Sequence, residues 1–325
     1  MHAWRVHEFG PYRDALVWEE APDPELMGPE STIIDVHAAG VNFPDVLFVQ
    51  GEYQIKPPLP FSPGIEAVGT VSVAGEASRY KVGDRIVATG LGAFATKMTA
   101  LDSMTFLVPD SMNDIDAAAI RIIYETSYMA IKYKAHMQPG EVLLVHGGAG
   151  GVGTSAIQVG KALGGMVIAT ATGERDIKVC YETGADHVID WKNEDIAARV
   201  KELTNNQGAD VIYDPVGGDA FDASTHCINF EGRLIVIGFA SGRIPEIKGH
   251  MILNKNMSVM GFFWTNYLFK RPDLVDDYQR EINELYVEGK FKPVVSAVKP
   301  MSELIDAFDH IMHKDAYGKI VLVNE

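Results

Sequence analysis

Three glycines in one short run have the spacing needed to bind a phosphate group. Gly148, Gly150 and Gly153 follow an apolar segment, residues 142–146, and open a stretch whose apolar side chains recur at helical spacing. In such a strand, turn and helix, the first glycine permits a tight turn, the second lets backbone approach a pyrophosphate, and the third lets the helix pack on the strand. The free N–H groups at the helix start would face the anion.

This run therefore predicts a dinucleotide site rather than an ordinary strand-to-helix turn. The expected contacts come from its consecutive residues Gly148, Ala149, Gly150, Gly151, Val152 and Gly153.

The elements around the glycines indicate a doubly wound parallel sheet. Between residues 119 and 262, six strand-like segments alternate with helical ones, and each is apolar throughout, as expected for strands covered on both faces. The segments are residues 142–146, 166–171, 187–190, 209–214, 233–238 and 257–261. An α/β fold with a Rossmann dinucleotide-binding domain follows.

The flanking parts of the chain have a different pattern. Residues 1–118 contain short β-rich pieces broken by Gly and Pro, which indicate a mostly β domain. The tail has a helical pattern near 278–288 and another over 302–313; we expect strands at 294–298 and 319–323. We expect two domains, one formed by residues 1–118 and completed by 263–325, the other by residues 119–262.

Composition excludes several classes of partner. A hydrophobic fraction of 47% without a long apolar run indicates a globular protein with no membrane span. The formal charge of −16 opposes nucleic acid as the principal partner. Two cysteines supply neither a disulfide framework nor a four-cysteine zinc site. The first residues lack the apolar core of a signal peptide, so a cytoplasmic location is expected.

Several motifs together resemble the medium-chain dehydrogenase/reductase superfamily, in its zinc-free quinone oxidoreductase branch. They are residues 40–47, 57–60 with 63–69, 80–85, 145–153, 184–190 and 253–258. The resemblance spans nearly the whole chain. It implies a GroES-like substrate domain built from both chain ends, a nucleotide domain between them, and an active site where they meet. It also implies a homodimer joined through the nucleotide domains.

This chain differs from the zinc-dependent relatives at the positions of their metal ligands. Those relatives place a cysteine and a histidine where this chain has Asn42 and Ile65, and neither residue supplies the thiolate or imidazole that zinc prefers. Glu66 remains, but one carboxylate holds no catalytic zinc. The cysteine-rich lobe that binds a structural zinc in those relatives is missing here, because residues 88–94 continue the chain where it would be inserted. We therefore expect no metal and no Lewis-acid polarisation of an alcohol.

The nicotinamide coenzyme is expected to be NADP(H). Residues 169–173, at the end of the second strand, lack the carboxylate that would accept the ribose hydroxyls of NAD. Thr172, Arg175 and Lys178 lie close enough in sequence to receive a 2′-phosphate. By resemblance, Trp191 stands where relatives often have a tyrosine against that phosphate.

Two acidic residues, Glu174 and Asp176, oppose this assignment, and Asp176 stands where many relatives carry lysine. Arg175 and Lys178 could instead form a solvated first helical turn.

Three residues are implied by the resemblance to line the substrate side. Tyr53 is the expected donor to a carbonyl oxygen or the proton source, Asn42 a second donor, and Asp45 an orienting group. Structural alternatives stay open for each. Asn42 could close a turn, Asp45 could cap the turn that follows it, and Tyr53 could be a half-buried packing residue.

On the cofactor side, the resemblance implies that Thr126 contacts the nicotinamide and Asn256 reaches its amide or ribose. Phe239 and Phe263 are the aromatic residues expected at the cofactor. Residues 261–264 could form an aromatic wall there or a core seam between domains.

Other polar residues give weaker signals. Glu125 could bias the site against anionic substrates or pair with Arg121. His310 and His313 share a helical face but have no further ligand for a metal.

These observations predict a metal-free, NADPH-dependent reductase of quinones or of the activated C=C of conjugated carbonyls. Hydride would pass from nicotinamide C4, and solvent or Tyr53 would supply the proton. Reduction of quinones by single electrons is not separated from this route. The alternatives are a nucleotide-binding protein with little turnover, in a structural, RNA-associated or membrane-associated role, and a zinc-independent alcohol or ketone reductase.

Overall fold

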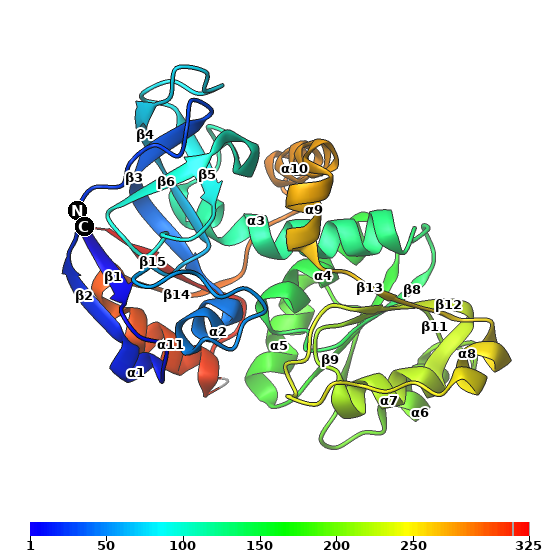
Figure 1. The fold of residues 1–325 in the computed structure, drawn as a ribbon. Helices are drawn as coiled ribbons and strands as arrows, with labels where there is room; N and C mark the ends of the chain where they lie inside the picture. The colour runs from blue at the N-terminus through cyan, green and yellow to red at the C-terminus, as the bar shows by residue number, and fades with distance from the viewer. Residues whose placement is uncertain (314, 325) are drawn as a thin grey trace. The chain divides into compact units, whose positions relative to one another are not determined.

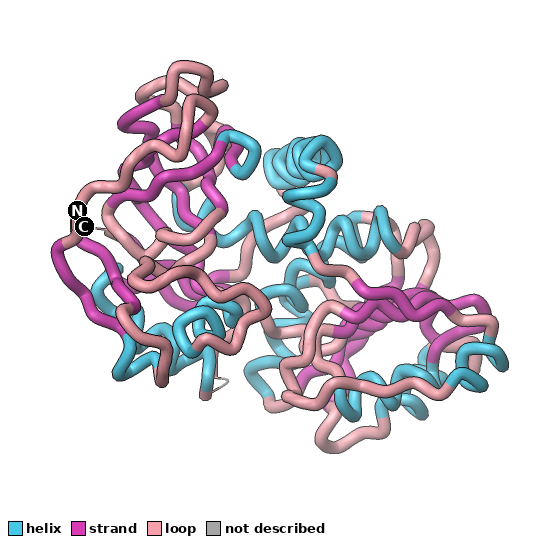
Figure 2. Tube along the Cα trace, viewed as in Figure 1, coloured by secondary structure: helices cyan, strands magenta, loops and turns pink. Residues whose placement is uncertain are grey.

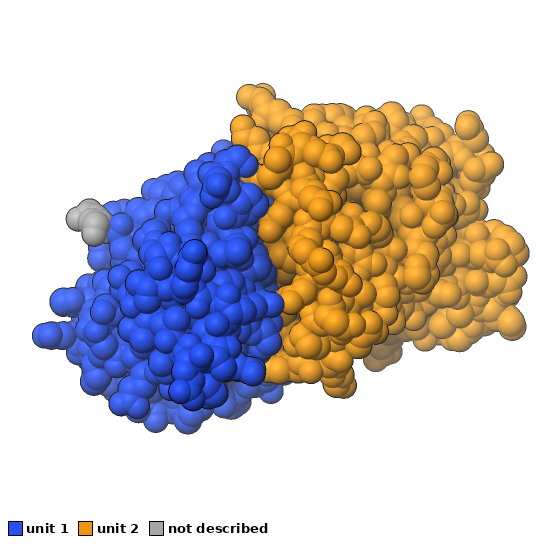
Figure 3. Space-filling model, turned by 90° about the horizontal axis from the view of Figure 1, so that it is seen from above, with its two compact units in different colours: residues 1–122, 295–325 blue, residues 123–294 orange. Residues whose placement is uncertain are grey.

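The computed structural model describes residues 1–313 and 315–324, and these form two compact units. The first unit is Met1–Ile122 with Val295–Glu325, and the second is Ile123–Val294. Figure 3 draws them in blue and orange. These bounds differ from the expected domains mainly in the tail, because residues 263–294 belong to the second unit.

The second unit is built on a six-stranded parallel sheet in the described part of the chain (Figures 1 and 2). Its strands are β8 (Val142–Val145), β9 (Met166–Ala171), β10 (His187–Asp190), β11 (Ala209–Asp214), β12 (Ile228–Val236) and β13 (Ser258–Gly261). Their order is β10-β9-β8-β11-β12-β13, which confirms the doubly wound fold. The connecting helices are α4 (Gly151–Ala162), α5 (Glu174–Thr183), α6 (Ile196–Leu203), α7 (Gly218–Cys227) and α8 (Gly249–Lys255).

The strand order places the glycine run at a functional position. The order reverses at β8, because β9 lies on one side of it and β11 on the other. Ligands of doubly wound sheets bind outside the carboxyl ends of the strands at this switch point. Leu144, Ile168 and Ile212 have no exposed surface, which agrees with strands covered on both faces.

Both chain ends contribute to the sheet of the first unit. Its order is β14-β15-β3-β4-β5-β7, and β6 also pairs with β3. The strands are β3 (Ser31–Val41), β4 (Glu66–Ala74), β5 (Arg85–Thr89), β6 (Lys97–Leu101), β7 (Thr105–Leu107), β14 (Val295–Pro300) and β15 (Lys319–Val323). Thus β15, from the end of the chain, lies between β14 and β3.

Smaller elements complete the first unit. Strands β1 (His2–Val6) and β2 (Leu16–Glu20) pair with each other. The helices are α1 (Tyr12–Ala15), α2 (Phe43–Gln50), α11 (Leu304–Met312) and the short η1 (Asp102–Met104) and η3 (Met301–Glu303). The GroES-like, mostly β expectation for this part is confirmed.

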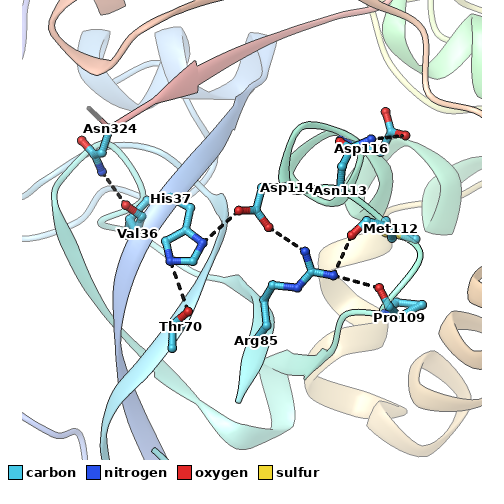
Figure 4. A network of polar contacts seen from close by, with 10 residues as sticks. All are labelled: Val36, His37, Thr70, Arg85, Pro109, Met112, Asn113, Asp114, Asp116 and Asn324. Atoms are coloured by element: carbon cyan, nitrogen blue, oxygen red, sulfur yellow. Dashed lines mark hydrogen bonds and ion pairs between the residues drawn. The ribbon is translucent and has the colours of Figure 1, made fainter. Parts of the chain in front are cut away.

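A polar network anchors the start of helix α3 (Asp114–Tyr128) to this sheet (Figure 4). Asp114 Oδ2 lies 2.9 Å from His37 Nδ1, and Arg85 Nη1 donates to Asp114 Oδ1 at 3.0 Å. His37 Nε2 also lies 3.2 Å from Thr70 Oγ1. An acidic residue in the first turn suits the helix dipole. The amino end of α3 is thereby fixed to β3, β4 and β5.

Aromatic packing explains why residues 263–294 join the second unit. After α3 come the π-helix η2 (Met129–Lys134), and later α9 (Trp264–Lys270) and α10 (Pro272–Val287). Tyr128 and Tyr278 pack edge to face with ring centroids 5.7 Å apart, and Tyr128 Oη donates to Glu281 Oε2 at 2.8 Å. Lys132 also bonds Glu281. These contacts hold α10 against α3 and η2.

None of the helices in residues 1–313 and 315–324 is long and apolar enough to cross a membrane.

Candidate functional site

The glycines of the 148–153 turn are required for two different reasons. A Cβ on Gly148 would lie 2.8 Å from Ala169 Cβ, and a Cβ on Gly153 would lie 2.1 Å from the Gly147 carbonyl oxygen. Those two glycines are needed by the protein's own packing. A Cβ on Gly150 would come no closer than 3.4 Å to that oxygen, and its φ of −72° suits any residue. Packing therefore does not explain Gly150, whereas close approach of a pyrophosphate would.

A buried histidine supports the turn from below. His146 is fully buried, with Nδ1 3.2 Å from Thr170 Oγ1 and Nε2 2.8 Å from Ser224 Oγ. The Thr170 carbonyl accepts the Gly148 N–H at 2.9 Å. Burial lowers the pKa of His146, and the nearby Asp214 only partly opposes this effect. A neutral imidazole is thus part of the support for the turn.

A hydroxyl cluster joins α3 to the first turn of α4, and sequence reasoning missed it. Ser127 Oγ lies 2.7 Å from Ser155 Oγ and 3.0 Å from Tyr213 Oη. Both serine hydroxyls are 3.1 Å from the Val152 carbonyl oxygen. Thr126, the expected nicotinamide contact, is adjacent to Ser127 and almost buried. Isolated serines carry no sequence signal; only the strand and helix packing brings them together.

The expected phosphate-binding side chains lie on one short stretch, and acidic groups already contact two of them. Arg175 is exposed, and its Nε donates to Asp176 Oδ1 at 2.8 Å. Lys178, also exposed, lies 3.6 Å from Glu182. The acidic neighbours therefore reduce the positive field of this helix start. Such exposed pairs are weak, so a phosphate dianion can compete for the cations.

A third acidic group lies beside Thr172. The Thr172 side chain hydrogen-bonds Asp190, at the end of the neighbouring strand β10. Hydrogen bonds lower the pKa of Asp190, and the one from the Asn193 side chain has the largest effect. Asp190 is therefore a carboxylate at neutral pH. Trp191 follows Asp190 and is half-exposed. Thr172 and Trp191 both lie beyond carboxyl ends of parallel strands, on the sheet edge that carries the glycine turn.

The aromatic candidates divide between surface and core. Phe239 and Phe263 are exposed and follow β12 and β13, which places them beyond the same carboxyl edge of the sheet. Phe262 and Trp264 are buried, and Trp264 Nε1 donates to the buried Glu125 Oε2 at 2.6 Å. Two of the four residues of the segment 261–264 are thus in the core, and Phe263 is its one exposed aromatic side chain. Glu125 is engaged by the indole.

Asn256 is not brought to this edge. It ends α8 with a φ of +49° and precedes β13. Because β13 runs parallel to β12, a residue before β13 lies at the amino edge of the sheet, opposite the glycine turn. The expected contact of Asn256 with the nicotinamide is therefore wrong for this geometry. A lone motif match could not show on which edge the residue falls.

The substrate-side candidates lie together in the first unit. Asn42 is the N-cap of α2, and its backbone N–H donates to Asp45 Oδ2 at 2.7 Å. Asp45 therefore lies inside the helix and closes a capping box with the residue before it, rather than capping the turn that follows it. Asp45 is fully buried, and burial raises its pKa to about 8. Tyr53, just beyond α2, is partly buried with its ring 4.3 Å from that of Phe48.

A lysine that sequence reasoning did not single out completes this group. Lys319 Nζ donates to Asn42 Oδ1 at 2.6 Å and to Glu66 Oε1 at 2.5 Å. Asn42 Nδ2 donates to Glu66 Oε1 at 2.9 Å and to the Gly40 carbonyl at 3.3 Å. Both ends of the Asn42 amide are thus engaged within the protein, so the expected role of Asn42 as a second donor to substrate is corrected. Lys319 is 277 residues from Asn42 in sequence, beyond the range of any local pattern.

Two family models match the chain. Residues 28–110 match the alcohol dehydrogenase GroES-like domain, and residues 151–285 match the zinc-binding dehydrogenase domain. Quinone oxidoreductase-like protein 2 homolog from Nematostella vectensis is 35% identical over 94% of this chain and 85% of its own length. The chain belongs to the medium-chain dehydrogenase/reductase superfamily, in its zinc-free quinone oxidoreductase branch.

Solved structures agree with this membership. A mycobacterial protein solved with NADPH is 30% identical, covers 99% of both chains and superposes with a TM-score of 0.92. Escherichia coli quinone oxidoreductase, also solved with NADPH, is 27% identical over 99% of this chain and 100% of its own, with a TM-score of 0.91.

The residues of this family member do not fit a zinc ion, despite the description of the second matched model. Asn42 and Ile65 are poor zinc ligands, and Glu66 and Asn42 both accept hydrogen bonds from the Lys319 ammonium. A zinc ion would have to displace that cation. Within residues 1–313 and 315–324 there is also no group of three His, Cys, Asp or Glu side chains that could hold a metal.

Proposed function

We propose that the protein is an NADPH-dependent reductase that transfers hydride, without a metal, to a quinone or to the activated C=C of a conjugated carbonyl. The observation that carries this proposal is Gly150, a glycine that internal packing does not require, at the start of a 12-residue helix on the switch-point strand. The two solved relatives that are complexed with NADPH support the choice of coenzyme.

The proposed chemistry balances with no other reactant. Bound NADPH would supply a hydride, two electrons with one proton, for the electrophilic carbon or oxygen of the substrate, and would leave as NADP⁺. A proton from solvent or from Tyr53 completes the hydroquinone or saturated carbonyl. We assign to the coenzyme the Gly148–Gly153 turn, Thr126, Phe239 and Phe263. We assign to its 2′-phosphate Thr172, Arg175, Lys178 and Trp191. Tyr53 and Asp45 are assigned to the substrate.

The test follows the absorbance of NADPH with 1,2-quinones, 1,4-quinones and enals in turn. The proposal expects oxidation of NADPH that depends on both enzyme and acceptor. Tight binding of NADPH with no oxidation across the panel would favour a nucleotide-binding protein without turnover. Reduction of NADP⁺ by simple alcohols would favour an alcohol or ketone reductase instead.

A homodimer is part of the same proposal. Strand β13 ends the strand order of the second unit's sheet, and an edge strand offers unpaired backbone groups to a second copy. Light scattering on the purified protein should give twice the mass of one chain. A monomer at micromolar concentration would contradict this part.

A further inference from the structure

The first unit contains a buried cation that the proposed chemistry has not used. Lys319 is 3% exposed, Glu66 is fully buried and Asn42 is 7% exposed. Lys319 opens β15, Glu66 opens β4, and Asn42 directly follows β3, which lies between those two strands. The pairings Ile320 with Val41 and Ala67 with Ala39 bring these three side chains to neighbouring register positions.

A glycine makes room for the cluster. A Cβ on Gly40 would lie 2.6 Å from Glu66 Oε1 and 2.1 Å from the Ala118 carbonyl oxygen. The second oxygen of Glu66 accepts the Ile122 N–H at 3.2 Å. The carboxylate is therefore held by backbone from α3 on one side and by the ammonium and the Asn42 amide on the other.

Stability is a weak reason to keep such a cluster. Taking an ammonium and a carboxylate out of water costs several kcal/mol per ion, and apolar replacements of buried ion pairs are often neutral or stabilising. What the cluster does achieve is placement. The cluster fixes both the oxygen and the nitrogen of the Asn42 side-chain amide. The backbone N–H of Asn42 in turn donates to Asp45 Oδ2.

Asp45 is the group on which the cluster acts. It is fully buried, and its Oδ1 has no hydrogen-bond partner among the described residues. The charged groups that act on it are Lys319 from β15, which lowers its pKa, and Glu66 from β4, which raises it. Helix α1, which also packs against α2, carries the partly buried Tyr12 and the exposed Arg13 and Asp14; Tyr12 and Arg13 both bond Asp309.

We propose that Lys319 is a positioning residue for the reduction: its ammonium, held between Glu66 and Asn42, fixes Asn42 and through it the Asp45 carboxyl. This inference rests on the proposed function, since Asp45 is assigned there to the substrate. The Lys319 ammonium, on the last strand of the chain, is then the cation of a site that holds no metal.

The kinetic test uses Lys319→Met, which removes the charge and keeps most of the length of the side chain. The turnover number should fall about tenfold or more, while the dissociation constant for NADPH stays unchanged, because the coenzyme residues belong to the other unit. Lys319→Arg should recover part of the loss. Lys299→Met is the matched control: Lys299 is in the adjacent β14 and pairs with Asp306, and its loss should leave turnover unchanged.

The second readout is the titration of Asp45, followed by carboxyl carbon NMR of the intact protein. Lys319→Met should raise the pKa of Asp45 above its value of about 8, and Glu66→Gln should lower it. The alkaline limb of the pH–rate profile should move in the same directions and disappear in Asp45→Asn. This readout works whether or not the protein turns over, so failure of the proposed function is seen separately from failure of this inference.

Folding is controlled by the double variant Lys319→Met/Glu66→Gln, which removes both buried charges together. If Lys319→Met does not fold, the double variant takes its place in both measurements. It should show a lowered turnover number with unchanged NADPH affinity, and a pKa of Asp45 close to that of the wild type because the two shifts cancel. Wild-type turnover in folded Lys319→Met, or in the folded double variant, would overturn the inference. So would an Asp45 titration that neither single charge change moves.

Discussion

Gly150 is the residue at which packing and binding can be separated by experiment. Replacement by alanine would bring the new Cβ only to van der Waals contact with the Gly147 carbonyl oxygen, at 3.4 Å, and needs no strained φ, so Gly150→Ala should fold with wild-type stability. The added methyl group should still raise the dissociation constant for NADPH by about tenfold or more, because it would lie at the position proposed for the pyrophosphate.

Gly153→Ala is the control for this prediction. Its Cβ would meet the Gly147 carbonyl at 2.1 Å, so it should lose about 1–3 kcal/mol of stability. Calorimetric titration with NADPH and chemical denaturation of both variants provide the measurements. Equal NADPH affinity for wild type and Gly150→Ala would contradict the assignment.

Arg175 tests the coenzyme choice at its phosphate. Arg175→Ala should raise the Michaelis constant for NADPH far more than that for NADH, since only NADPH carries the 2′-phosphate. Asp176→Asn should act in the opposite sense and lower the constant for NADPH, because it removes a negative charge and weakens the 2.8 Å bond that Arg175 donates to this side chain. Steady-state kinetics with each coenzyme decide this. Equal changes for both coenzymes would refute the phosphate assignment.

Single residues are also where prediction from sequence failed most. The spacing of Gly148, Gly150 and Gly153 carried its own signal, because a turn is a local structure. Lys319 and Ser155 carried none, since a buried lysine and a buried serine gain meaning only from partners distant in sequence. Asn256 was misplaced because a motif gives no information about which sheet edge it reaches.

Among the elements, the strand β8, the glycine turn and α4 depend on the neutral state of His146. Its pKa is lowered in the folded protein, so below about pH 6.5 the unfolded chain binds a proton that the folded protein does not. The free energy of unfolding should therefore fall as the pH falls from about 6.5 to 5.

His146→Asn isolates this contribution, because asparagine does not titrate. Urea denaturation over that pH range should show a smaller decline for the variant than for the wild type. The same slope for both proteins would mean that His146 is protonated in the folded state or that its pKa is not lowered.

Elements were predicted well where their pattern is strong. All six parallel strands occur, because each is a continuous apolar run between turn residues. Strand β12 begins earlier than expected, at Ile228, through residues that include the positive φ of Glu231. Helix α3 was not predicted: the three alanines and one isoleucine at residues 117–120 are all buried, so no amphipathic stripe marks it.

At the scale of the molecule, the last strand closes the first unit. β15 pairs with β14 on one side and with β3 on the other, so it joins both ends of the chain in one sheet. The sequence beyond residue 262 did not indicate that residues 263–294 belong to the second unit and the rest to the first, since the contact of α10 with Tyr128 is formed only in three dimensions.

Deletion of residues 319–325 should therefore unfold the first unit and leave the second folded. Hydrogen exchange should become fast throughout β3 and β4 while β8, β9 and β11 stay protected. NADPH should still bind, because its proposed contacts lie in the second unit. Protected β3 and β4 in the truncated protein would contradict the central place of β15.

The whole account depends on a reduced nicotinamide that lies at the glycine turn and reacts without a bound metal. The most direct measurement is the oxidation of NADPH by protein freed of metals with a chelator, in the presence of a quinone or an enal, together with mass analysis of product formed from NADPH deuterated at C4. The account predicts full activity after chelation and deuterium at the reduced carbon of the enal product. Loss of activity that only added zinc restores would contradict it.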